Sequence, residues 1–91
     1  MSEDVYGRNL EKVVAGLNKA GVSAEIRGTS TSRFVFSRLN DRTVEISWAG
    51  DDGIFVEYWE GQEDRPSSRE ETVKTFEIAT NKAIEWLQYK P

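Results

Sequence analysis

Four short segments between residues 22 and 59 alternate apolar with polar residues, and this pattern constrains the fold more than any other feature of the chain. Alternation with a period of two is typical of β-strands that bury one face. The segments are 22–27, 33–37, 43–48 and 54–59. The stretches between them are short and rich in turn-forming residues, which favours an antiparallel meander over parallel crossovers.

A helical pattern precedes these segments and occupies residues 4–20. Its apolar residues recur at helical spacing: Leu10, Val13, Val14 and Leu17. Ser2 or Asp4 can cap the start of the helix, because their side-chain oxygens accept a hydrogen bond from a free backbone N–H. Gly21 follows the last apolar residue and can adopt the left-handed conformation that ends a helix.

A second helical pattern follows the alternating segments. We expect residues 60–67 to form a loop, and we interpret Ser68 and Glu71 as a capping box at the start of the helix. The predicted buried stripe of this helix is Val73, Phe76, Ala79, Ala83, Trp86 and Leu87. The predicted order of elements is therefore α-β-β-β-β-α.

With 91 residues, the chain is expected to form a single domain, residues 1–91. The predicted class is α+β: a four-stranded antiparallel meander flanked by an N-terminal and a C-terminal helix. Two amphipathic helices can cover one face of such a sheet, so that two layers enclose one core.

Side-chain alternation restricts how the strands pair. A two-residue loop at 40–41 would pair Phe36 with Glu45 and mix the apolar and polar faces. A three-residue loop at 40–42 pairs Phe36 with Ile46 and keeps the apolar faces together, so we favour it. The core predicted from this register contains Phe36, Ile46, Val56 and Phe76.

The next turn determines what the other face of the sheet carries. A loop at 50–52 pairs Ile46 with Val56, and this register places Glu45 opposite Glu57. The large aromatic residues of the last segment lie on the same face. The predicted binding site on this face consists of Glu45, Phe55, Glu57, Trp59, Val35 and Leu39.

Two features of this face are unfavourable unless something covers it. Like charges directly opposite one another destabilise a strand pair, and clustered exposed aromatic residues are unusual. A basic, partly apolar protein partner or a second subunit would relieve both. An alternative remains open, because the segment 54–59 is apolar on both sides and could be an ordinary core strand with a helix on each face.

Residue types restrict the chemistry. The chain contains no His and no Cys, which excludes a disulfide framework. No spacing of residues indicates a metal site, a cofactor, a phosphate-binding loop or an activated nucleophile. Glu45 and Glu57 could act as a general acid/base pair, but a flat sheet lacks the pocket that catalysis uses. We therefore expect a non-enzymatic protein, with a small enzyme as the third reading.

The net charge of −4 disfavours generic binding to nucleic acid, which needs a basic patch. A nucleic-acid-associated module is the second reading, suggested by arginines and phenylalanines on adjacent strands: Arg27, Arg33, Phe34, Phe36, Arg38 and Arg42. No apolar run approaches a membrane span, and the first residues show no secretory signal, so we expect a cytoplasmic protein. The leading hypothesis is a protein-binding module, such as an inhibitor, an immunity-type protein or a chaperone-like adaptor.

Overall fold

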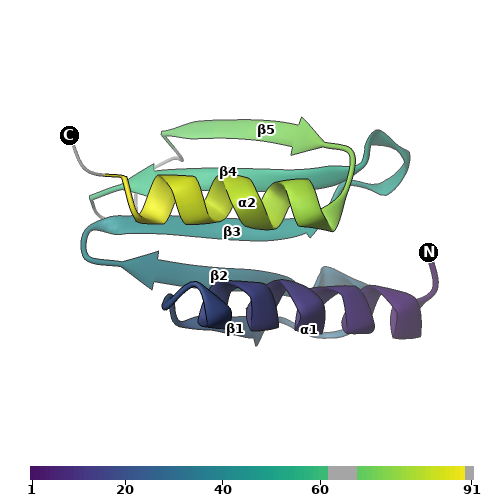
Figure 1. Ribbon diagram of the computed structural model, residues 1–91. Coiled ribbons are helices and arrows are strands. Elements are labelled where there is room, and N and C mark those ends of the chain that lie inside the picture. The colour runs from purple at the N-terminus through teal and green to yellow at the C-terminus, as the bar shows by residue number, and fades with distance from the viewer. Residues whose placement is uncertain (62–67, 90–91) are drawn as a thin grey trace.

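The computed structural model describes residues 1–61 and 68–89. These residues form two α-helices, five β-strands and two short 3-10 helices, labelled in chain order in Figure 1. The bounds are α1 Glu3–Lys19, β1 Ala24–Arg27, η1 Ser30–Ser32, β2 Phe34–Leu39, β3 Arg42–Trp48, η2 Gly50–Asp52, β4 Ile54–Glu60, β5 Arg69–Val73 and α2 Phe76–Leu87.

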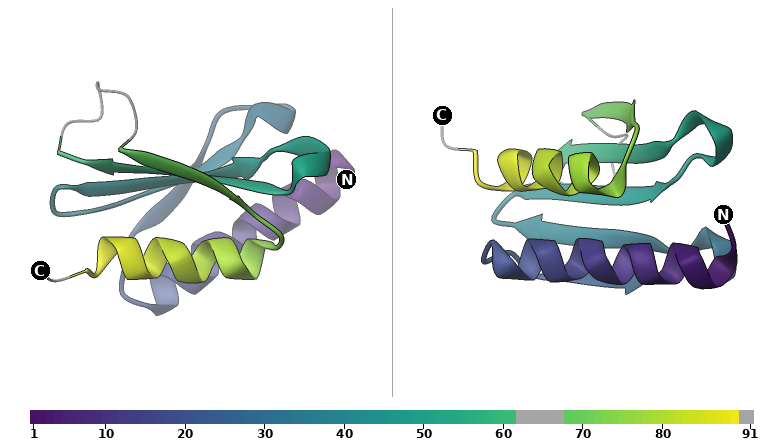
Figure 2. Two further views of the ribbon diagram at one scale, coloured as in Figure 1. Left: turned by 90° about the horizontal axis from the view of Figure 1, so that it is seen from above. Right: turned by 45° about the vertical axis from the view of Figure 1, so that its right-hand side comes forward.

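The five strands form one antiparallel sheet in the order β1-β2-β3-β4-β5, so each strand pairs with its neighbour in sequence. Helix α1 packs over β1 and β2, and α2 packs over β3 and β4 (Figure 1). Both helices lie on the same side of the sheet (Figure 2). The predicted α+β class, with an antiparallel meander and a helix at each end, is confirmed, but the predicted number of strands is wrong.

The core lies between the helices and the sheet face that they cover. It combines one stripe from each helix with alternate residues of the strands, as period-two patterning requires. Its buried apolar residues are Tyr6, Leu10, Val13, Leu17, Val22, Val35, Val44, Ile46, Ile54, Val56, Tyr58, Val73, Ala79, Ala83 and Leu87.

Helix α1 begins and ends at signals that the sequence carries. The Ser2 hydroxyl accepts a hydrogen bond from Val5 N at 3.2 Å, which satisfies a backbone N–H of the first turn. Gly21 has a φ of 86°, a left-handed conformation that glycine adopts without strain. Within the helix, the Tyr6 hydroxyl donates to Arg33 O and accepts from Trp48 N, so partly buried hydrogen bonds connect α1 to β3 and to the residue before β2.

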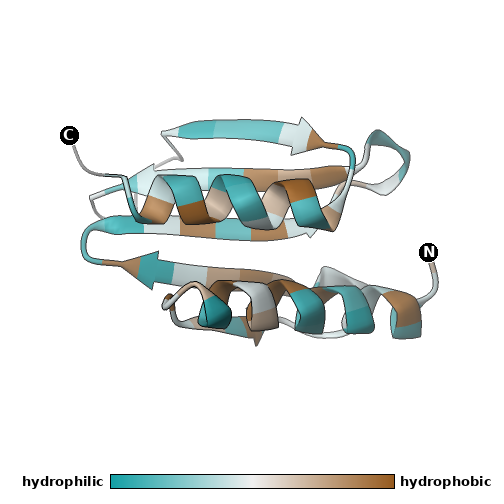
Figure 3. Cartoon of the chain, viewed as in Figure 1, coloured by the Kyte–Doolittle hydropathy of each residue, from teal (hydrophilic) through white to brown (hydrophobic). Residues whose placement is uncertain are grey.

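Strand β5 was not expected from the sequence, and the predicted capping box is wrong. Residues 69–73 pair with β4, with Tyr58 opposite Arg69 and Ile54 opposite Val73. Pairing satisfies the backbone groups along the outer edge of β4, which a helix starting at Ser68 would leave unpaired. Figure 3 shows β5 as hydrophilic over most of its length, and this conceals the strand pattern. Of the predicted loop, Glu60 belongs to β4 and residues 62–67 lie outside the described residues.

The second helix begins instead at Phe76, after the N-cap residue Thr75. The Thr75 hydroxyl accepts from Ile78 N at 3.1 Å. Of the predicted stripe, Ala79, Ala83 and Leu87 are buried, as expected, whereas Val73 is a strand residue. Phe76 is only half-buried and packs against the edge of the core, with its ring centroid 6.2 Å from that of Tyr6.

We expect Thr75→Ala to lower the free energy of unfolding by about 0.5–2 kcal/mol, because Ile78 N loses its acceptor at the start of α2. A urea titration of the variant measures this loss. Thr31→Ala, at an exposed position outside both α-helices, serves as the control. Equal stability of Thr75→Ala and wild type would show that this cap does not stabilise the helix.

The register between β2 and β3 differs from the one we favoured. The turn consists of Asn40 and Asp41, with Asn40 at a φ of 58°, and Phe36 lies opposite Glu45. Val35 lies opposite Ile46 and is fully buried beneath the helices. Phe36 therefore belongs to the opposite face and is not part of the predicted core group.

Two local contacts explain why this register is stable. Ser37 points to the helix side, and its buried hydroxyl donates to Ser23 O at 2.6 Å, so the polar group is satisfied. Phe36 remains only 9% exposed because the Arg27 guanidinium lies 3.6 Å from the centroid of its ring. The phenylalanine is thus covered by a cation rather than by a helix.

Candidate interaction surface

The sheet face opposite the helices, here called the open face, carries a row of acids. Glu45 of β3 lies directly opposite Glu57 of β4, and Glu57 lies opposite Glu70 of β5. We call these three residues the acid row. Neither Glu57 nor Glu70 takes part in an ion pair within residues 1–61 and 68–89. Glu57 and Glu70 therefore place two negative charges, unpaired within the described residues, side by side on β4 and β5.

Aromatic residues flank the acid row on two strands. Phe55 and Trp59 of β4 lie two residues before and after Glu57, and both are half-buried. Phe34 and Phe36 lie on β2, where Phe36 is the neighbour of Glu45 across the strand pair. Because alternate residues of a strand share a face, all four rings belong to the open face.

The open face is hollowed beside Phe36. A recess of about 280 Å³ lies over β1 and β2 and is lined by Ser23, Ala24, Glu25, Phe36 and Arg38. Arg27 extends over the Phe36 ring and also pairs with the Glu25 carboxylate at 2.6 Å. This end of the face therefore combines an apolar floor with a charged rim.

The pKa values of two acids on opposite faces of the sheet, Glu57 and Glu71, are shifted in opposite directions. Burial, reinforced by repulsion from Glu70, raises the pKa of Glu57 above its ordinary value. On the helix side, a hydrogen bond from the Tyr58 hydroxyl and the nearby Lys82 lower the pKa of Glu71 despite partial burial. The charged form is therefore disfavoured at Glu57 and favoured at Glu71.

We expect Glu57→Gln to raise the free energy of unfolding at neutral pH by about 0.2–1 kcal/mol, because it removes a like-charge pair. The pKa of Glu57 is higher in the folded protein than in the unfolded chain. At a pH below the unfolded-state pKa, Glu57 is neutral in both states and does not destabilise the fold. As the pH rises through the folded-state pKa, the carboxylate becomes charged and the protein loses stability. The stabilisation by Glu57→Gln should therefore vanish near pH ~3.

Glu71→Gln is the matched comparison and should have the opposite sign. The pKa of Glu71 is lower in the folded protein than in the unfolded chain. The charged Glu71 therefore stabilises the fold at a pH above the unfolded-state pKa, and this stabilisation is lost as the pH falls through the folded-state pKa. Urea titrations of both variants at neutral and acidic pH test the pair. A loss of stability in Glu57→Gln at neutral pH would contradict the inference that the charge of Glu57 destabilises the folded protein.

The structure brings together four of the six predicted site residues. Glu45, Phe55, Glu57 and Trp59 share the open face in the predicted pairings of β3 with β4. The placement of Val35 and Leu39 on this face is wrong, because the shorter β2–β3 turn directs both towards the helices.

Sequence reasoning missed Phe34, Phe36 and Glu70 as residues of the open face. The two-residue turn at 40–41 would have placed both phenylalanines on this face. Asn40 favours that turn, because asparagine readily adopts the left-handed conformation that the turn requires. Glu70 depends on recognising β5. The period-two pattern of the first four segments contained no information about that strand.

The described residues do not assemble a metal site: no group of three or more His, Cys, Asp or Glu side chains among them could hold an ion. The acid row is linear and shares its face with aromatic rings. The recess lies over β1 and β2 rather than over the Glu45–Glu57 pair. This arrangement suits contact with an extended surface better than the enclosure of a substrate.

Comparison of the chain with models of protein families, with curated proteins and with solved structures finds no match in any of the three. Neither α1 nor α2 has the length and apolar character that crossing a membrane requires.

Proposed function

We propose that this protein is a non-enzymatic protein-binding module whose open face contacts a basic, partly apolar partner. The observation that carries the proposal is the acid row flanked by aromatic residues on the sheet face away from both helices. In this proposal the protein has two layers, the sheet and the two helices that cover one of its faces. The partner covers the other face.

Charge supports a basic partner. Adjacent carboxylates repel one another, and cations placed between them convert this repulsion into attraction. Opposite charge also accelerates encounter between partners, so the acid row would steer the approach as well as the final register. Inhibitors, immunity-type proteins and chaperone-like adaptors are classes that work by such contacts. A cytoplasmic location is part of the proposal, and a chain without cysteine is compatible with it.

The aromatic residues supply the apolar part of the contact. Trp and Tyr are enriched among residues that dominate binding energy, and they act when surrounding contacts exclude water. Phe55 and Trp59 lie on either side of Glu57. A partner side chain that carries a cation beside an apolar group could therefore contact the carboxylate and a ring together. The recess beside Phe36 offers space for one inserted side chain.

A second copy of the chain fits this face less well than a different protein. A two-fold symmetric dimer uses the same patch on both subunits. Pairing through the centre of the open face would bring two acid rows together and increase the repulsion. Nucleic acid is disfavoured for the same reason, because its phosphates are negative.

Selection from a random-peptide display library, with the full chain as bait, tests the proposal. Enriched peptides should combine Lys or Arg with aromatic or aliphatic residues, and their binding should weaken as salt increases. Glu57→Lys should abolish the enrichment, whereas Glu11→Lys, an equal charge change on the exposed side of α1, should retain it. Enrichment of acidic or neutral peptides, or equal loss in both variants, would refute the proposal.

A further inference from the structure

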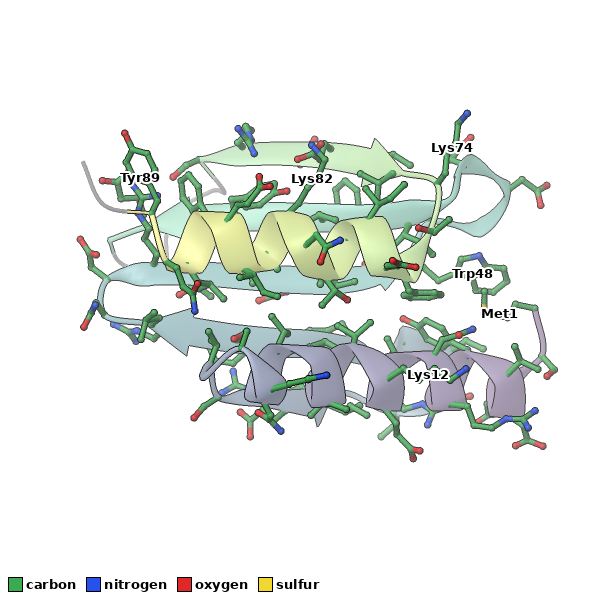
Figure 4. The ribbon with its side chains drawn as sticks, in the orientation of Figure 1. Met1, Lys12, Trp48, Lys74, Lys82 and Tyr89 are labelled. Carbon is green, nitrogen blue, oxygen red and sulfur yellow. The ribbon has the colours of Figure 1, made fainter. Side chains whose placement is uncertain are left out.

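A hollow on the helix side of the sheet gathers three cations, Arg42, Arg69 and Lys82, beside one lining acid, Glu85. It has a volume of about 260 Å³ and lies between the C-terminal part of α2 and the strands β3 and β5. Its lining residues are Arg42, Arg69, Lys82, Glu85, Trp86 and Tyr89. Figure 4 shows Lys82 extending from α2 towards β5 and Tyr89 beyond the end of α2.

Arg42 is held rigidly in this hollow. Its guanidinium lies 4.2 Å from the ring centroid of Trp86 and 4.6 Å from that of Tyr89. Its Nη1 donates to Trp86 O at 3.1 Å, and its side chain is only 15% exposed. The Trp86 ring is itself fixed, because its Nε1 donates to Thr43 O at 3.1 Å. A guanidinium held in this way loses little freedom when it binds a ligand.

Arg69 and Lys82 share a single carboxylate. Arg69 Nη2 lies 3.3 Å from one Glu71 oxygen, and Lys82 Nζ lies 3.2 Å from the other. The Arg69 guanidinium also lies 4.5 Å from the ring centroid of Tyr58, whose hydroxyl donates to Glu71. One negative group thus fixes two cations that remain 59% and 40% exposed in their side chains.

We propose that this hollow binds a small phosphate-bearing anion through Arg42, Arg69 and Lys82. Guanidinium groups match phosphate oxygens in a two-pronged geometry, and the lysine adds a flexible point charge. Three acids lie at the cluster: Glu60, Glu71 and the lining residue Glu85, which forms no ion pair with these cations in the part of the chain that the structure describes. Glu71 serves two cations, and Glu60 lies 3.8 Å from Arg42 Nη2 with its own side chain 57% exposed.

The size of the hollow selects the ligand class. Pockets for drug-sized molecules span roughly 300–1,000 Å³, so this hollow suits a smaller phosphorylated molecule. The Trp86 and Tyr89 rings provide an apolar wall beside the cations. The site lies on the opposite side of the sheet from the acid row, and the inference is therefore independent of the proposed protein-binding function.

Isothermal titration with inorganic pyrophosphate at constant ionic strength tests the inference. We expect saturable binding at millimolar concentrations that chloride at equal ionic strength does not reproduce. Arg69→Gln and Lys82→Gln should each weaken binding by about tenfold or more, because each removes a charge-assisted hydrogen bond. Both side chains are substantially exposed, so both variants should remain folded.

Lys74→Gln supplies the matched control, because it removes one exposed cation away from the hollow. Retention of pyrophosphate binding in Lys74→Gln, together with its loss in Arg69→Gln and Lys82→Gln, would support the site. Equal weakening in all three variants would show a general charge effect and overturn the inference. Absence of binding to the wild-type protein at millimolar pyrophosphate would overturn it as well.

Discussion

Val35→Lys is expected to unfold the protein, whereas Phe36→Lys is expected to leave it folded. Val35 is fully buried beneath the helices and lies between Ile26 and Ile46 in the register of the sheet. A lysine there would bury an unpaired charge, at a cost of about 3–5 kcal/mol. Loss of about 1.5–3 kcal/mol of apolar burial adds to this cost. Small domains are stable by only about 5–15 kcal/mol, so the combined loss unfolds a domain at the lower end of that range.

At the neighbouring position a lysine meets two acids and also the Arg27 guanidinium that covers Phe36. Phe36 lies between Glu25 and Glu45 on the open face. Its replacement forfeits up to about 1.5–3 kcal/mol of apolar burial. Because no helix covers this face, the lysine can extend its ammonium group into water and leaves no buried charge.

Urea titrations followed by circular dichroism compare these two variants. The three-residue turn that we first favoured for β2 and β3 predicts the reverse order, with Phe36 in the core and Val35 on the outside. A folded Val35→Lys beside an unfolded Phe36→Lys would therefore contradict the observed register.

Trp59→Ala should weaken binding of a selected basic peptide by about thirtyfold or more, since truncating an aromatic anchor can cost 2 kcal/mol or more of binding. Phe55→Ala, on the other side of Glu57, should act in the same direction. Both variants should lose more binding free energy than folding stability, because the two rings lie outside the core enclosed by the helices.

Ile78→Ala is the control for these variants, since Ile78 is an exposed apolar residue of α2. Fluorescence anisotropy of a labelled peptide measures affinity, and urea titration measures stability. If Trp59→Ala unfolds the protein while Phe55→Ala leaves affinity unchanged, the open face does not bind through its aromatic residues.

The sequence predicted the elements whose two faces differ clearly. In β3, Val44 and Ile46 alternate with Glu45 and Ser47, so the pairing with β4 followed from pattern alone and is confirmed. Helix α1 was predictable for the same reason, because its apolar stripe lies between a cap and a glycine. Together with a loop at 50–52, these segments place Glu45 opposite Glu57.

The β2 register could not be settled by pattern because both of its faces are apolar. Phe36 is covered by Arg27 from the neighbouring strand, and this contact between separate segments leaves no local trace in the sequence. Strand β5 is polar, and only its pairing with β4 makes it a strand. Thr72 and Val73, which are both β-branched, were the available local signal for it.

The most direct test of the central claim is an NMR titration of the isotope-labelled protein with a selected basic peptide. The side-chain resonances are followed as the peptide is added. Binding at the open face predicts that the ring signals of Phe36, Phe55 and Trp59 shift and saturate together. The methyl signals of Val13 and Ile84, which line a groove of about 580 Å³ between α1 and α2, should stay constant. Shifts confined to Val13 and Ile84, with the open-face rings unchanged, would contradict it.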